Sequence, residues 1–158
     1  MNMEWPELID AAVRADWPSP EKQEFVKNGL IFLQNFFGDD VLKVAFESYH
    51  PYFAETINLA PWNLQRYAEF GHRINVLRAV PNAYRRLKQL RNASLKFPDR
   101  GSIENFFGFF SEVEIAYPFV AGGITTEFIQ ETKTRTPDLR VKIDDRWLNK
   151  EFKLEFIR

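Results

Sequence analysis

Two acids and one lysine near the carboxyl end of the sequence are of the types that metal-assisted hydrolysis needs. Asp138 follows Pro137, and the triplet Glu151-Phe152-Lys153 comes after twelve intervening residues. Carboxylate oxygens suit a hard divalent cation, and a lysine beside such an ion can orient a water or stabilise developing charge. If these side chains converge, the chemistry that they indicate is cleavage of a phosphodiester bond.

The stretch 136–156 has the pattern of a β-hairpin. Apolar and polar residues alternate on both sides of Asp144 and Asp145, which we predict to form a two-residue turn. Asp-Asp is less suited than Asn-Gly to the positive φ of such a turn, and a four-residue loop would change the pairs but keep the parity. The predicted core face consists of Leu139, Val141, Ile143, Leu148, Phe152, Leu154 and Phe156, with Lys150 as its one polar member.

The register of this hairpin decides whether the polar groups meet. A two-residue turn pairs position 143 with position 146, and the same register places Asp138 directly opposite Glu151. Cross-strand partners have Cβ atoms roughly 5 Å apart, and Lys153 lies on the same face, two residues beyond Glu151. A slip of one residue would turn the apolar set away from the core, so burial favours this register. The alternative is a solvated hairpin face without chemistry.

An amphipathic helix is predicted upstream, over 102–120. Its apolar residues recur every three or four positions. Ser102 is the predicted N-cap, and the Gly122-Gly123 pair ends the helix. A Thr-rich, alternating strand then begins at Ile124 and runs to Glu131, ahead of the Pro-Asp strand.

In this order of helix, strand, Pro-Asp strand and Glu-x-Lys strand, the segment 102–156 resembles the first half of the PD-(D/E)XK nuclease core. The matching stretches are 111–116 (Ser-Glu-Val-Glu-Ile-Ala), Gly123, 136–139 (Thr-Pro-Asp-Leu) and 151–153 (Glu-Phe-Lys). The resemblance implies an α/β (α+β) fold, in which a helical N-terminal part precedes a restriction-endonuclease-like half core of one helix and a mainly antiparallel three-stranded sheet.

The resemblance also implies roles for individual residues. Asp138 and Glu151, with the backbone carbonyl of Phe152, would ligate Mg²⁺ or Mn²⁺. Lys153 would orient or help deprotonate the attacking water. The implied activity is metal-dependent hydrolysis of nucleic acid, with DNA as the expected substrate. The alternative is a nuclease fold without turnover that binds nucleic acid or a partner protein.

A helix acid would complete such a site. Glu112 is the first choice, because Glu-Val-x-x-Ala is similar to the Glu-Leu-x-x-Ala of the family, and Glu114 is the reserve. Both flank the apolar stripe, so helical phase does not separate them. A solvated helix edge is the other interpretation of either residue.

The segment departs from the family after the Glu-x-Lys strand. Such nucleases usually continue into a helix and a further strand, whereas only 154–158 remain here. We expect one of three explanations: a longer natural chain, cover of the sheet by the N-terminal region or by a second chain (in a homodimer, a second copy), or a relic site. A hydrophobic terminal strand needs such cover.

Composition sets the class of protein. The 158 residues suit one domain or two small ones, and 45% hydrophobic residues suffice for a packed core. The absence of cysteine excludes a disulfide framework and a thiolate zinc site. Neither a signal peptide nor an apolar run near twenty residues is present. We therefore expect a soluble, cytoplasmic protein without membrane contact.

The part before Pro98 reads as mostly helical. A helix starts at Ser19-Pro20-Glu21 and continues to Gly38, and further helices are predicted over 40–49, 62–80 and 81–92. The turn 98–101 separates this helical region (1–97) from the nuclease-like half core (102–158).

Charge is distributed unevenly along the chain. Residues 1–70 hold eleven acids and five bases, whereas residues 71–97 hold seven bases and no acid. A basic segment of this kind predicts salt-dependent contacts to the nucleic-acid backbone. The candidate contacts are Arg73, Arg78, Arg85, Arg86, Lys88 and Arg91. The alternative is that this segment packs against the acidic N-terminal helices.

The tryptophans and histidines were also considered as functional residues. The tryptophans would suit a protein-interaction domain if they are exposed; they are Trp5, Trp17, Trp62 and Trp147. His50 and His72 are more typical of surface or hydrogen-bonded core histidines than of catalytic bases.

Overall fold

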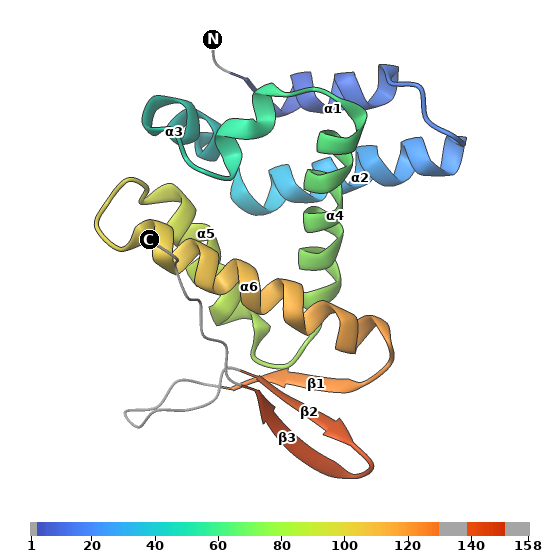
Figure 1. Cartoon of the computed structure of the whole chain (residues 1–158), viewed down its shortest axis with the longest axis vertical. Coiled ribbons are helices and arrows are strands. Elements are labelled where there is room, and N and C mark those ends of the chain that lie inside the picture. Colours follow the sequence, from blue (N-terminus) through green and yellow to red (C-terminus); the bar gives the residue numbers. More distant parts are fainter. Residues whose placement is uncertain (1–2, 130–138, 151–158) are drawn as a thin grey trace.

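A computed structural model of the chain describes residues 3–129 and 139–150. It has the predicted α+β architecture (Figure 1), with α1 to α4 in the upper part of the view and a small sheet at the lower end, beneath α4, α5 and α6. The helices are α1 (Trp5–Arg14), α2 (Pro20–Phe37), α3 (Asp40–Ser48), the short 3-10 helix η1 (Phe53–Ile57), α4 (Pro61–Leu77), α5 (Ala83–Leu95) and α6 (Ser102–Ala121).

Local capping explains where two of these helices begin and end. The Ser19 hydroxyl accepts a hydrogen bond from the backbone N–H of Lys22 at 3.1 Å, ahead of Pro20, and Gly38 ends α2 at φ 81°. Both ends of α2 are as predicted. The prediction of Ser102 as N-cap is wrong, because Gly101 holds that position in the left-handed conformation at φ 80° and Ser102 is the first helical residue.

A single hydrophobic cluster contains residues from the N-terminal helices and from α6. Phe106 of α6 lies 5.8 Å, between ring centroids, from Phe53 of η1, and Phe110 of α6 lies 4.8 Å from Phe70 of α4. These contacts bury the apolar stripe of α6 against the helical part. The helix that carries the predicted site acids is therefore held by the main core.

Helices α2 and α4 cross with their backbones in close contact. A Cβ atom on Gly71 would overlap the carbonyl oxygen of Gly29, and one on Gly29 would overlap the backbone of Ala68. Glycine is thus required at both positions by packing, because the helix-to-helix distance leaves no room for a side chain.

The sheet is antiparallel, in the order β1 (Thr125–Phe128), β2 (Leu139–Ile143) and β3 (Arg146–Lys150). In the β2–β3 hairpin, residue 139 pairs with 150 and residue 143 with 146. Asp144 and Asp145 form the turn at φ 51° and 62°, as a two-residue turn with positive φ at both positions requires. The predicted register is confirmed for every pair that the structure describes.

The predicted core face of the hairpin is only partly buried. Leu139 and Val141 are buried, whereas Ile143 is 40% exposed and Leu148 is 49% exposed. The reason is that α6 packs on β1 and β2, while the turn end extends past the helices (Figure 1). The prediction is therefore wrong for the turn end of the hairpin. Within the described ranges, none of the helices is long and apolar enough to span a membrane.

Candidate active site

The acids and lysine of the predicted metal site lie outside the described residues. This applies to Asp138, Glu151, Phe152 with its carbonyl, and Lys153. The described hairpin ends at the pair Leu139 and Lys150, the residues next to the two acids in the sequence. The elements that would position the site are nevertheless in place: α6, β1 and the β2–β3 hairpin.

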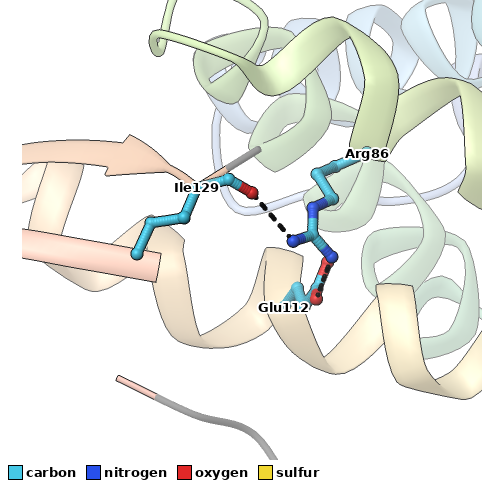
Figure 2. A network of polar contacts seen from close by, with 3 residues as sticks. All are labelled: Arg86, Glu112 and Ile129. Atoms are coloured by element: carbon cyan, nitrogen blue, oxygen red, sulfur yellow. Dashed lines mark hydrogen bonds and ion pairs between the residues drawn. The ribbon is translucent and has the colours of Figure 1, made fainter. Parts of the chain in front are cut away.

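A buried network joins α5, α6 and the end of β1 (Figure 2). Arg86 of α5 places Nη1 3.1 Å from Oε1 of Glu112 on α6, and its Nη2 donates to the carbonyl oxygen of Ile129, just after β1, at 2.9 Å. The two charged side chains are only 7% and 8% exposed. A buried pair of this kind is costly to break, because the remaining charge would lose its partner. The network therefore fixes Glu112 beside the end of β1.

The loop between α4 and α5 holds the same strand. Asn82 donates from its side-chain amide to the carbonyl oxygen of Phe128 at 2.9 Å, and the backbone N–H of Phe128 donates to the carbonyl oxygen of Pro81 at 3.1 Å. Together with the Arg86 bond to Ile129, these contacts fasten the carboxyl end of β1 to the start of α5. The chain enters the predicted Pro-Asp strand from this fixed point.

The structure separates the two candidate helix acids. Glu114 forms an ion pair with Arg73 of α4, and the Arg73 guanidinium lies 5.4 Å from the ring centroid of Tyr117. Glu114 thus faces α4, whereas Glu112 faces α5 and the end of β1. Residues two positions apart on a helix point in directions that differ by about 200°. This explains why Glu112 lies beside the end of β1 and Glu114 does not. The apolar stripe alone could not show this.

An acid that sequence reasoning missed lies on the sheet. Glu127 of β1 pairs with Arg140 of β2 in the strand register, and their side chains form an ion pair. The Arg140 guanidinium lies 4.2 Å from the ring centroid of Trp147 on β3. Opposite charges at directly paired positions stabilise a sheet. Only the β1–β2 register reveals this contact.

The six basic candidates fall into two groups. Arg73 and Arg86 are held in ion pairs by Glu114 and Glu112 of α6, so the described ion pairs of this segment do not run to the acidic N-terminal helices. Arg78, Lys88 and Arg91 instead line a groove of about 570 Å³. Arg85 is exposed on α5. The basic segment is thus divided between structural arginines and solvent-facing cations.

The two histidines are structural, as predicted. His50 is fully buried, and its Nδ1 accepts hydrogen bonds from the backbone N–H groups of Tyr52 and Phe53 at 3.1 and 3.3 Å. Burial lowers the pKa of His50 to about 4, because charging the ring would cost solvation. His72 stacks on Phe25, with ring centroids 4.0 Å apart.

The described residues contain no group of three or more His, Asp or Glu side chains that could hold a metal ion. The acids predicted as metal ligands, Asp138 and Glu151, lie outside these residues, and carboxylates of this kind suit Mg²⁺ or Mn²⁺. Comparison with known protein families, curated proteins and solved structures finds no match to this chain.

Proposed function

We propose that this protein is a metal-dependent nuclease that hydrolyses phosphodiester bonds, with DNA as the expected substrate. The observation that carries the proposal is the hairpin register, in which Leu139 pairs with Lys150 across an Asp-Asp turn. The same register predicts Asp138 opposite Glu151. It was expected from alternation and turn length alone, and the described pairs agree with it.

The proposed roles follow from the chemistry of the side chains. Asp138 and Glu151, with the carbonyl of Phe152, would hold Mg²⁺ or Mn²⁺. The bound ion would polarise the phosphate and lower the pKa of a coordinated water. Lys153 would orient that water and stabilise negative charge as the phosphorus–oxygen bond breaks.

Glu112 is the helix acid that we propose for this site. It is the glutamate of α6 that lies beside the end of β1, and Arg86 fixes its position. Glu114 faces α4 and is engaged by Arg73. The location of Glu112 thus supports the choice that its Glu-Val-x-x-Ala context suggested.

The test is cleavage of labelled DNA in Mg²⁺ or Mn²⁺. Lys153→Ala and Asp138→Asn should each reduce the cleavage rate by about 10²-fold or more, since each removes a group that acts in the transition state, while DNA binding persists. Lys150→Ala, three positions earlier in the sequence, removes the same type of side chain as a matched control and should cleave normally. Unchanged cleavage by Lys153→Ala would end the proposal.

A second candidate is a nuclease-like module that binds nucleic acid without turnover. The observation in its favour is the groove lined by Arg78, Lys88 and Arg91, which needs no metal to attract phosphate. This function predicts tight, salt-dependent binding in EDTA and no cleavage in Mg²⁺ or Mn²⁺. Metal-dependent cleavage that Lys153→Ala abolishes would reject it.

A further inference from the structure

The groove beside α5 combines cations with an exposed aromatic ring. Tyr84, Leu87, Lys88 and Arg91 lie on one face of α5, because they are spaced by three or four residues. Arg78 at the end of α4 and the last turns of α2 complete the lining. The volume of about 570 Å³ is in the range of small-molecule and nucleotide pockets.

Among the described residues, no carboxylate forms an ion pair with the cations of the groove. Within residues 3–129 and 139–150, neither Arg78 nor Lys88 nor Arg91 forms an ion pair, and all three side chains are exposed. Arg73 and Arg86 differ from these three cations, because glutamates of α6 form ion pairs with both of them. Three like charges around one groove create a positive potential that an anion would relieve.

Tyr84 indicates which anion this is. Its side chain is 78% exposed and lies one helical turn before Lys88 on the groove face, while Leu87 forms a buried floor. An exposed ring among cations is the arrangement by which proteins stack a base and hold the adjoining phosphates of a single strand. A duplex hides the faces of its bases, so it would use the cations but not the ring.

We propose that this groove binds single-stranded nucleic acid, with phosphates on Arg78, Lys88 and Arg91 and a base stacked on Tyr84. The choice of nucleic acid as ligand rests on the proposed nuclease function. The groove lies beside α5, whose N-cap residue Asn82 donates a hydrogen bond to the carbonyl oxygen of Phe128 at the end of β1.

The experiment measures fluorescence anisotropy of a labelled twelve-nucleotide oligo(dT) in EDTA, where cleavage cannot occur. The triple variant Arg78→Gln, Lys88→Gln, Arg91→Gln should bind at least tenfold more weakly. A plot of the logarithm of the binding constant against the logarithm of the salt concentration should also be less steep, by about 2. The reason is that each phosphate contact on a single strand contributes about 0.7 to the steepness. Arg14→Gln with Lys43→Gln, exposed cations of α1 and α3, is the control and should bind like the wild type. A triple variant that binds like this control would overturn the proposal.

Tyr84 provides an independent test of stacking. Tyr84→Ala should weaken oligo(dT) binding by about 5- to 100-fold, and Tyr84→Phe should restore it, because stacking needs the ring and not the hydroxyl. A matching duplex should be insensitive to Tyr84→Ala. If poly-glutamate competes as well as oligo(dT) and Tyr84→Ala has no effect, the groove binds acidic peptides and the proposal is wrong.

The same variants separate this inference from the nuclease proposal. Binding in EDTA that depends on Arg78, Lys88 and Arg91, with no cleavage in Mg²⁺, would support the groove and reject the nuclease. Metal-dependent cleavage together with unchanged binding by the triple variant would support the nuclease and reject the groove. Circular dichroism should show the same thermal transition for all variants, because the altered side chains are exposed.

Discussion

His50 makes the stability of this fold depend on pH. The side chain is fully buried, and its ring lies 4.8 to 5.2 Å, between centroids, from the rings of Phe53, Phe97 and Phe106. Its Nδ1 must be unprotonated, because it accepts the backbone N–H groups of Tyr52 and Phe53. Protonation would break both hydrogen bonds and place a charge in the aromatic core.

The sign and size of the effect follow from the pKa values of the two states. The pKa of His50 is about 4 in the folded protein, against 6.5 for an unperturbed histidine. Well above pH 6.5 the ring is neutral in both states and contributes nothing to the pH dependence. As the pH falls below 6.5, the unfolded chain binds a proton that the folded chain does not, so the free energy of unfolding decreases. Between pH 7 and pH 5 the loss is about 2 kcal/mol.

Urea unfolding at pH 7, 6 and 5 measures this loss. His50→Asn removes the titration, and its amide oxygen can still accept a backbone N–H. The variant will be less stable at every pH because it fills the site less well, so the informative quantity is the change between pH values. The wild type should lose about 2 kcal/mol more than His50→Asn from pH 7 to pH 5.

The reasoning fails if the free energies of unfolding of the wild type and of His50→Asn decrease by the same amount from pH 7 to pH 5. That result would mean that the imidazole titrates normally in the folded protein, and hence that water reaches the ring. The interval stays at or above pH 5 because many carboxylates titrate below it and would obscure a single histidine.

Three further predictions concern the helix packing, the buried ion pair and the turn. Gly71→Ala should lower the free energy of unfolding by about 3 kcal/mol or more, because its Cβ would overlap the Gly29 carbonyl and force α2 and α4 apart; thermal melting measures this, and a loss under 1 kcal/mol would show that the helices can separate easily. Arg86→Met should cost about 3 to 5 kcal/mol by leaving the Glu112 carboxylate buried without its guanidinium, and adding Glu112→Leu should recover much of that; the reasoning is wrong if the double variant is less stable than the single one. Asp145→Gly should stabilise the hairpin by about 1 kcal/mol, because φ is 62° at this position; no gain in urea unfolding would count against strain in the turn.

Features set by neighbouring residues were predictable. The hairpin register followed from alternation and from a two-residue turn, and the structure reproduces it from Leu139 to Lys150. The start of α2 followed from Ser19 and Pro20. The N-cap of α6 was missed by one position, since Gly101 at φ 80° holds it and Ser102 is the first helical residue; helix ends are uncertain by one or two residues in sequence-based prediction. The exposure of the hairpin tip was also missed, because burial there depends on how far α6 extends over the sheet.

Local periodicity and turn chemistry predicted helices close to α2, α3, α4, α5 and α6 and the register of the β2–β3 hairpin, but neither α1 nor the register of β1 with β2. Tertiary packing decided the charged contacts. It places Arg86 in contact with Glu112, 26 positions away in the sequence, and pairs Arg73 with Glu114. It also places Arg78, Lys88 and Arg91 around one groove. The physical reason is that a helix pattern defines which residues share a face, whereas the partner of each face depends on how distant helices pack together.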